Sequence, residues 1–474
     1  MKLPDYRDFG LLALLLIAGA FLNSCKTPSE PNVGNYPSSV SAIIQKNCNS
    51  GNCHGSATTL NGGLDLSTWE AMTNGSILLN DVIPYSAVNS HLFGHINTNS
   101  LIGPTFTPQM PLSLNPLSTA DQLAIFNWIN QGAKSEDGRV PYNEVTQKIF
   151  VINQGDNCVS VLDAVTQRLV RVIPTIATLP TSVAVVPGGQ YFIVGCSGAN
   201  GSIRKYDASN YSLVAEFEST FSPSSIVITP DGSKGYITDE AYSGNRLLAF
   251  DPITMSITRT IQTPLIIDPN YLKCSPDGKY VYVCGHGSDN ILRIDTQTDE
   301  ILKSIPLGLD VEVPPTTAYA RKYTPEQMVI SMDSKTMYVS CLNTSEVVEI
   351  NLTNDSIINR IPVLHNPWGL TLSPDGLELW VAVWGSSSVE AISTQTNQRI
   401  ARLDSTSSLP HAITITPDGR HVIAVCELAA GGAHHHGTGG TPPSSYVVMD
   451  RLTKKIVSVN DLPSLSLDIT MGYK

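Results

Sequence analysis

The fold is decided by residues 271–284, which read YLKCSPDGKYVYVC. Two short runs rich in β-branched and aromatic residues, YLKCS and YVYVC, flank a Pro-Asp-Gly turn at residues 276–278. Such runs near period two predict strands, and the turn residues between them predict an antiparallel pair. Two further strands are expected in NILRIDT at 290–296 and ILKSIPL at 301–307. Residues 271–307 therefore predict one four-stranded antiparallel unit.

The turn of this unit, or a remnant of it, recurs along the chain at spacings of 42 to 56 residues. A period of roughly 40–45 residues with short strands is typical of β-propeller blades. The set is Pro187-Gly188-Gly189, Pro230-Asp231-Gly232, Pro276-Asp277-Gly278, Met332-Asp333-Ser334, Pro374-Asp375-Gly376 and Pro417-Asp418-Gly419.

The repeat region contains seven such four-stranded units. The strands at its two ends are expected to belong to the same unit. The first unit, beginning KIFVINQ at 148, lacks its first strand, and SLDITMG at 466–472 is a lone strand. We expect the last strand to complete the first blade and so remove an exposed sheet edge. Residues 146–474 are thus predicted to form a closed seven-bladed β-propeller. The repeat resembles the YVTN-type propeller of bacterial surface and periplasmic proteins.

The N-terminus predicts export. An apolar run of 14 residues, Phe9 to Leu22, follows Lys2 and Arg7, which fits a signal peptide better than a membrane span. The sequence LNSC at 22–25 resembles the lipobox of bacterial lipoproteins, which implies a signal peptide over 1–24 and lipidation of Cys25. Residues 25–36 are expected to form a tether. The alternative is an ordinary signal peptide, which keeps export and loses the membrane anchor.

A second motif lies at Cys48, Cys53 and His54, in the spacing C-x4-C-H. The haem c signature is C-x-x-C-H, so the present spacing is two residues longer. In that signature two thiols bond to the vinyl groups of one porphyrin edge and the next histidine reaches the iron. Two alternatives stay open: a Cys48–Cys53 disulfide, and a zinc site, for which a fourth ligand at suitable spacing is missing.

The residues around this motif resemble a bacterial cytochrome c family over residues 37–140. The resemblance rests on GGLDL at 62–66, on Pro108-Gln109-Met110-Pro111, and on LSTADQLAIFNWINQGA at 117–133. It implies a small α-helical domain with one covalent haem c on Cys48 and Cys53. It also implies His54 and Met110 as iron ligands, since a thioether is a common second axial ligand. His91 and His95 are competing candidates.

The last segment of that resemblance also predicts a helix with defined ends. Ser118 is expected to cap it, and Gly132 to close it. Its apolar face should comprise Leu123, Ile125, Phe126 and Ile129, around Trp128.

One face of the propeller is predicted to collect histidines. The loops between second and third strands open on the same face as the blade-to-blade connections. These loops hold Trp368, Trp384 and the residues that form a possible second metal or cofactor site: His286, His365, His411, His434, His435 and His436. Imidazole is a common metal ligand. The alternative is a solvated rim that docks a partner.

Composition narrows the function further. Charged residues make up 15% of the chain and the net charge is −12, so nucleic acid is a poor partner. The preferred hypothesis is an exported, lipid-anchored haem c electron-transfer protein whose propeller docks a partner or substrate. The alternatives are a periplasmic redox enzyme with a metal or cofactor on the histidine face, and a surface recognition propeller without redox activity. Six cysteines are predicted to be buried apolar residues: Cys158, Cys196, Cys274, Cys284, Cys341 and Cys426.

Overall fold

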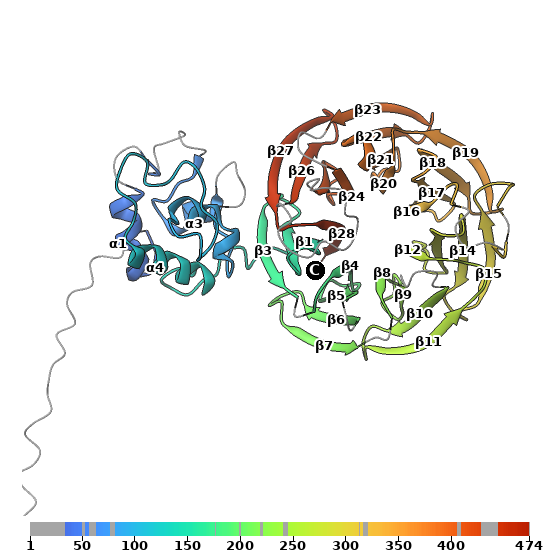
Figure 1. Ribbon diagram of the computed structural model, residues 1–474, viewed down its shortest axis with the longest axis horizontal. Helices are drawn as coiled ribbons and strands as arrows, with labels where there is room; N and C mark the ends of the chain where they lie inside the picture. The colour runs from blue at the N-terminus through green and yellow to red at the C-terminus, as the bar shows by residue number, and fades with distance from the viewer. Residues whose placement is uncertain are drawn as a thin grey trace, which may run out of the picture.

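A computed structural model describes residues 34–473 with internal gaps. The description leaves out residues 50–52, 56–62, 76–80, 176, 199–200, 219–220, 240–244, 312, 316–320, 405–408 and 428–443. Its described residues form a ring of sheets with a small helical domain at the rim (Figure 1). The chain is therefore mainly β, as predicted.

Seven four-stranded antiparallel sheets make up the ring, one per blade. Blade 1 contains β28 (Ser466–Tyr473), β1 (Gln147–Asn153), β2 (Cys158–Asp163) and β3 (Leu169–Pro174). Blades 2 to 4 contain β4 (Pro180–Val185), β5 (Tyr191–Cys196), β6 (Ser202–Asp207), β7 (Leu213–Glu218), β8 (Pro223–Ile228), β9 (Gly235–Asp239), β10 (Arg246–Asp251), β11 (Ser256–Gln262), β12 (Pro269–Cys274), β13 (Tyr280–Gly285), β14 (Asn290–Asp295) and β15 (Ile301–Pro306). Blades 5 to 7 contain β16 (Pro325–Ile330), β17 (Thr336–Cys341), β18 (Glu346–Asn351), β19 (Ser356–Pro362), β20 (Pro367–Leu372), β21 (Glu378–Val383), β22 (Ser388–Ser393), β23 (Gln398–Asp404), β24 (Leu409–Ile415), β25 (His421–Glu427), β26 (Ser444–Asp450) and β27 (Lys455–Leu462).

The two ends of the repeat region meet in blade 1, which confirms the predicted closure. Strand β28 pairs with β1 in a register that sets Lys148 opposite Gly472 and Val151 opposite Ile469. At the far end of the pair, the buried Ser466 hydroxyl donates a hydrogen bond to the Asn153 side chain at 2.8 Å. The innermost strand of blade 1 is therefore supplied by the last residues of the chain.

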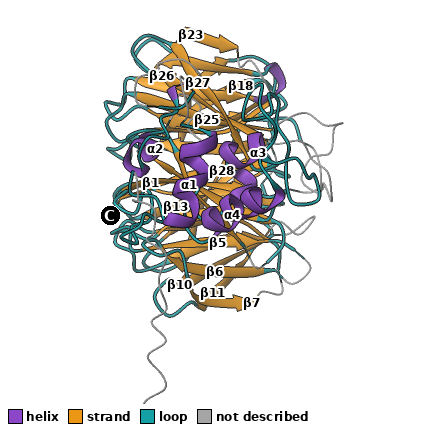
Figure 2. Cartoon of the chain, turned by 90° about the vertical axis from the view of Figure 1, so that its left-hand side faces the viewer, coloured by secondary structure: helices purple, strands orange, loops and turns teal. Residues whose placement is uncertain are grey.

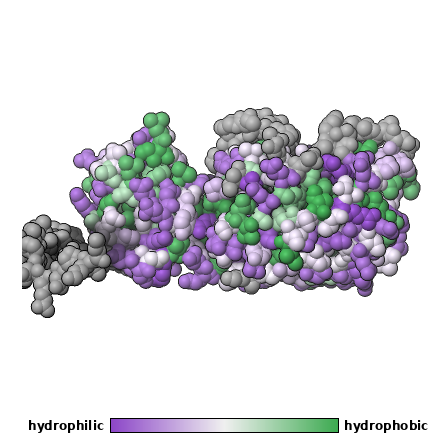
Figure 3. Space-filling model, turned by 90° about the horizontal axis from the view of Figure 1, so that it is seen from below, coloured by the Kyte–Doolittle hydropathy of each residue, from purple (hydrophilic) through white to green (hydrophobic). Residues whose placement is uncertain are grey.

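The core lies between neighbouring blades. Each inner pair of strands presents β-branched and aromatic side chains to the next sheet, as in the stack of Phe150, Phe192 and Tyr206, whose successive ring centroids are 4.6 and 5.1 Å apart. The six scattered cysteines are buried within these sheets and form no disulfide among the described residues. They act as small apolar residues, as predicted. The outermost strands are more exposed, and the rim mixes hydrophilic and hydrophobic side chains (Figure 3).

The repeated turn has a local physical cause. A Ser or Thr hydroxyl two residues before the aspartate donates to its carboxylate, and the backbone N–H two residues after it does the same; in blade 5 these groups belong to Ser331 and Lys335, at 2.6 and 3.1 Å from Asp333. The residue directly after the aspartate adopts a positive φ. It is glycine in four of these turns, and in blade 5 it is Ser334, whose φ is 59°. The turn thus closes the hairpin between first and second strands in blades 3 to 7.

The helical domain contains four short α-helices and the 3₁₀ helix η2 (Ala87–Asn89) among its described residues. They are α1 (Ser38–Asn47), α2 (Trp69–Asn74), α3 (His91–Ile96) and α4 (Thr119–Asn130). Ser118 caps α4 by accepting the Asp121 N–H, as predicted. Ile125, Trp128 and Ile129 are buried, whereas Leu123 is 38% exposed, so its assignment to the apolar face was wrong. The helix turns that residue toward solvent.

The helical domain packs against the outer strand of blade 1 (Figures 1 and 2). The guanidinium of Arg168 donates to the Asn74 carbonyl at 2.6 Å, and that of Arg171 stacks over the Tyr85 ring at 3.9 Å from its centroid. Ile83 joins the hydrophobic cluster of blades 1 and 7. Charged, aromatic and apolar contacts therefore fix this domain at one place on the rim.

Candidate functional site

The Cys48–His54 loop begins where α1 ends. The Cys48 N–H donates to the Ile44 carbonyl at 2.8 Å, and the His54 N–H donates back to the Cys48 carbonyl at 3.1 Å. The chain therefore folds over itself and brings His54 beside the end of the helix. Residues 50–52, inside the motif, lie outside the described residues.

The His54 ring is held by the backbone. Its Nδ1 lies 3.1 Å from the Leu64 carbonyl, and the Leu66 N–H bonds to the His54 carbonyl at 2.7 Å. A carbonyl can only accept, so Nδ1 carries the proton and Nε2 is left with its lone pair. This is the tautomer that a metal-ligating histidine needs, with its second nitrogen donating to a fixed acceptor.

The two cysteines of the motif are not joined by a disulfide. Cys48 is half-buried and Cys53 exposed, and burial together with the neighbouring Cys53 thiol raises the pKa of Cys48 to about 11. The alternative disulfide is not formed in this structure. Two thiols and a correctly oriented imidazole fit the donor set that covalent haem c requires, so the residues present fit the group.

Met110 shares a hydrophobic core with this motif. Its side chain is partly buried against the cluster that Cys48 also contacts, and its backbone N–H donates to the His95 carbonyl at 2.7 Å. The competing histidines have other contacts. The His95 Nδ1 lies 2.9 Å from the Pro108 carbonyl, and the His91 Nε2 lies 3.4 Å from Asp461 on β27.

A second candidate site is the mouth of the central channel, a cavity of about 500 Å³. Each blade contributes one residue at the start of its inner strand, the third residue in β24 and the second in the other six, and in six blades this residue follows a proline. We call this set the mouth ring: Leu467, Thr181, Ser224, Asn270, Glu326, Trp368 and His411.

Members of the mouth ring bond from one blade to the next. Thr181 donates its hydroxyl to the Pro223 carbonyl at 2.7 Å, and Ser224 donates to the Asn270 carbonyl at 3.1 Å. The Asn270 amide in turn donates to Glu326 Oε2 at 3.0 Å. These bonds link the inner strands of blades 2 to 5 around the opening.

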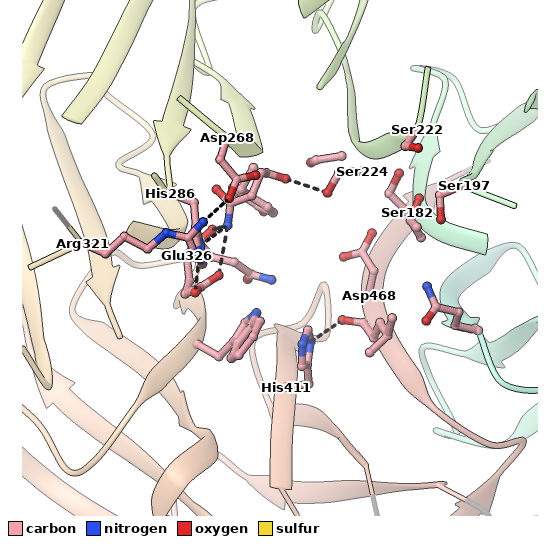
Figure 4. A pocket seen from close by; sticks show the side chains of 18 residues that line it. Ser182, Ser197, Ser222, Ser224, Asp268, His286, Arg321, Glu326, His411 and Asp468 are labelled. Carbon is pink, nitrogen blue, oxygen red and sulfur yellow. Dashed lines mark hydrogen bonds and ion pairs between the residues drawn. The ribbon is translucent and has the colours of Figure 1, made fainter. Parts of the chain in front are cut away.

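Two ionic pairs stand on one side of the mouth (Figure 4). The His286 Nδ1 lies 3.1 Å from Oε1 of the buried Glu326, and Arg321 lies 2.8 Å from Asp268. Burial opposes protonation of His286, but the Glu326 carboxylate outweighs it, so the pKa of His286 is raised above its usual 6.5. The histidine is therefore readily protonated against Glu326.

His411 occupies another part of the mouth. Its Nδ1 lies 2.7 Å from the Leu467 carbonyl, and its ring packs at a tilt against Trp368, with centroids 4.3 Å apart. Glu427 lies 3.8 Å from Nε2, and burial raises the pKa of that carboxyl to about 7. His411 is thus fixed by blade 1, blade 6 and its own blade.

The structure brings together part of the predicted histidine face. His286 and His411 both line the cavity, together with Trp368. His365 is exposed and does not line it, while His434, His435 and His436 lie outside the described residues. Within the part of the chain that is described, no three His, Cys, Asp or Glu residues are grouped so that they could hold a metal ion.

Sequence reasoning missed the other polar groups of the mouth. Asn270, Glu326 and Asp468 line the cavity on inner strands, and Arg321 lies on a connection. The dipeptide of proline and a polar residue, which recurs at the start of five of the seven inner strands, was the available signal. Asp468 accepts the Val183 N–H at 3.1 Å and faces the ionic pairs from across the opening (Figure 4).

Comparison with known proteins agrees with the propeller fold. A family model described as a YNCE-like β-propeller matches residues 200–434. Residues 200–434 are thus those of a YNCE-like β-propeller. No curated protein matches the chain.

Solved structures share the fold of this YNCE-like propeller. Hydrazine synthase of Kuenenia stuttgartiensis aligns with a TM-score of 0.50 and 21% identity over 58% of this chain and 88% of its own. The periplasmic gluconolactonase of Pseudomonas aeruginosa aligns with a TM-score of 0.54 and 13% identity, covering 69% of this chain and 99% of its own. A functionally unknown protein of Desulfotomaculum acetoxidans gives 0.53 and 12%, over 69% and 99%. At these identities the likeness concerns the fold alone.

Proposed function

We propose that this protein is an exported haem c electron-transfer protein whose propeller docks a redox partner or substrate. Cys48 and Cys53 would hold the haem through thioether bonds, and His54 and Met110 would ligate its iron. When bound, haem c supplies reversible one-electron transfer. The propeller would offer the channel mouth as the docking site.

The observation that carries the proposal is the bond between His54 Nδ1 and the Leu64 carbonyl, at 3.1 Å. It fixes the imidazole in the tautomer that leaves Nε2 for iron. A solvated histidine that merely follows two cysteines has no need of such an acceptor. Met110 supports the proposal because its side chain packs against the core that Cys48 contacts, while His91 and His95 contact Asp461 and Pro108.

The test is covalent haem in protein exported from a host with a c-type maturation system. We expect a c-type pyridine haemochrome spectrum from the wild type and none from the double variant Cys48→Ser, Cys53→Ser. Cys274→Ser, which removes a buried thiol of blade 4, should retain the haem. Two unmodified thiols, or a Cys48–Cys53 disulfide, in exported wild-type protein would refute the proposal and leave the recognition propeller without redox activity.

A redox enzyme is the second candidate, favoured by the cavity itself. His286 against Glu326 is an acid–base pair at the edge of a 500 Å³ space, and perturbed titratable groups in a cavity are typical of active sites. Turnover of a substrate that is lost in His286→Gln, with the haem spectrum unchanged, would favour the enzyme over the carrier.

Export and lipid anchoring through Cys25 form part of the same proposal. Within the described residues, no helix is both long and apolar enough to cross a membrane, and Cys25 lies outside those residues. Cys25→Ser should move the protein from the membrane fraction to the soluble exported fraction. Retention of that variant on membranes after removal of the signal peptide would contradict the anchor.

A further inference from the structure

The ionic groups around the channel mouth are largely matched with one another. Arg321 pairs with Asp268 at 2.8 Å and His286 pairs with Glu326 at 3.1 Å. The remaining acid, Asp468, accepts the N–H groups of Val183 and Ile469 at 3.1 and 2.9 Å, and burial raises its pKa. An anionic ligand would lie beside three acidic side chains, Asp268, Glu326 and Asp468. A cationic ligand would compete with Arg321 and His286 for the carboxylates that these two residues already contact. A neutral ligand disturbs neither pair.

Several polar side-chain atoms of the cavity wall have no hydrogen-bond partner within the described residues. The Gln154 Oε1 and Asn270 Oδ1 acceptors are buried and accept no hydrogen bond, and the Ser182 hydroxyl has no partner either. All three residues line the cavity. Buried polar groups are normally satisfied, so unpaired ones at a cavity wall point to a missing donor.

Hydroxyl groups are common on the wall of the cavity that lies across from the ionic pairs. Ser182, Ser197 and Ser222 face the ionic pairs across the opening (Figure 4). A ligand that donates and accepts hydrogen bonds at many points matches these hydroxyl groups and the amides of Gln154 and Asn270. Trp368 and Tyr271 add aromatic surface to the same cavity, on which the C–H face of a ring can pack. The volume of about 500 Å³ falls in the range of small-molecule sites.

We propose that the channel mouth binds an uncharged polyhydroxylated compound of saccharide type, as a free sugar or as the end of a longer glycan. The inference rests on the docking role proposed above and names the class of ligand docked there. Asn270 is its central contact, because its amide nitrogen already bonds to Glu326 while its oxygen is unpaired.

The test is calorimetric titration of the purified mature protein with neutral sugars and their charged counterparts. The panel contains glucose, galactose and mannose, the disaccharides cellobiose and lactose, the corresponding uronic acids, and glucosamine. We expect at least one neutral sugar to bind about tenfold or more tightly than its acid and amine counterparts. Stronger binding of the disaccharide than of its monosaccharides would identify a glycan end as the natural ligand, and the reverse would identify a free sugar.

Matched variants in the same blades assign the binding to the mouth. Asn270→Ala should weaken binding about tenfold or more, and Ser224→Ala should weaken it less. Ser233→Ala removes an exposed serine from the opposite face of blade 3, in the Pro230-Asp231-Gly232 turn, and should bind like the wild type. Thermal denaturation of each variant shows whether it is folded; if Asn270→Ala is not, Asn270→Asp replaces it.

Three results would overturn the inference: no binding of any neutral sugar, tighter binding of an acid or an amine, or binding that survives replacement of Asn270. The haem spectrum of the same samples keeps the two proposals separate. Protein that carries haem and binds no sugar refutes the ligand class alone. Protein that binds sugar and carries no haem refutes the electron-transfer role alone.

Discussion

At the scale of single residues, the helical domain combines a fixed imidazole with a thioether from a separate loop. His54 is oriented by the Leu64 carbonyl, and the backbone of Met110 is held by the His95 carbonyl at 2.7 Å. The proposed ligands thus come from segments far apart in sequence that share one hydrophobic core.

Met110→Ala tests the second of these ligands. Loss of the thioether should abolish the near-infrared sulfur-to-iron charge-transfer band of the ferric protein and lower the reduction potential, because thioether ligation raises it. Absorption spectroscopy and a redox titration measure both effects. Met332→Ala, which changes a methionine that is 79% exposed in a turn of blade 5, should alter neither. A spectrum that changes in His91→Ala or His95→Ala but not in Met110→Ala would assign the ligand to that histidine.

The residues of the motifs could be predicted from sequence, and their partners could not. C-x4-C-H is a local pattern, so Cys48, Cys53 and His54 are visible in it. Glu326 could not be predicted as the partner of His286, because this contact depends on how blade 5 packs against blade 4. The partner of His411 is a backbone carbonyl of Leu467, which no side-chain pattern reveals.

At the scale of elements, the hairpin turns between first and second strands repeat one network of hydrogen bonds. In blade 5 the Ser331 hydroxyl and the Lys335 N–H both donate to Asp333, and they hold the pKa of this carboxyl below its usual value. The same pattern recurs at Asp375 with Ser373 and Leu377.

Asp333→Ala should therefore destabilise the protein by about 1 kcal/mol at pH 6, the ordinary worth of a turn or cap hydrogen bond. A carboxyl whose pKa is lowered in the folded state contributes stability above its unfolded pKa of about 3.9 and loses it as the pH falls through the folded value. The difference from the wild type should accordingly shrink below about pH 4. Urea denaturation at several pH values measures it.

Met332→Ala is the matched control in the same turn, since its exposed side chain makes no part of the network. An Asp333→Ala variant that unfolds at the wild-type urea midpoint at pH 6 would contradict the role of the network. So would a difference that persists unchanged at pH 3.

The strands were predictable for the same local reason that these turns are. Alternating β-branched residues and a Pro-Asp-Gly sequence specify a hairpin without help from the rest of the chain. Leu123 shows where prediction from a local pattern fails. Its place in an apolar run suggested burial, but the side that α4 turns inward is decided by α1 and the loops it meets, and Leu123 lies outside that side.

At the scale of the whole molecule, the ring is closed by strands from opposite ends of the repeat region. Strand β28 pairs with β1 along most of its length, and its other neighbours include the inner strand of blade 2 and the first two strands of blade 7. It also supplies Leu467 and Asp468 to the channel mouth. Closure of the ring and completion of the candidate site thus depend on the same strand.

Deleting residues 465–474 should consequently cost several kcal/mol. The deletion removes the ladder bonds of β28 and the buried contact between Ser466 and Asn153, and it exposes the edge of β1. It also uncovers the hydrophobic cluster of blades 1 and 7 against which Ile469 packs, and it removes the buried side chain of Leu467. Thermal denaturation should show a lower midpoint, while deletion of Lys474 alone should leave the midpoint unchanged.

Addition of the missing strand in trans separates pairing from a general effect of truncation. A synthetic peptide of residues 465–474 should bind the truncated protein and raise its midpoint, because the vacant position offers both a sheet edge and apolar contacts. A peptide in which Ser466 and Leu467 are replaced by proline and aspartate should not, since it loses the Ser466 backbone donor and buries a carboxylate in place of Leu467. A truncated propeller that melts at the wild-type temperature, or that both peptides stabilise equally, would show that the ring does not depend on the pairing of β28 with β1.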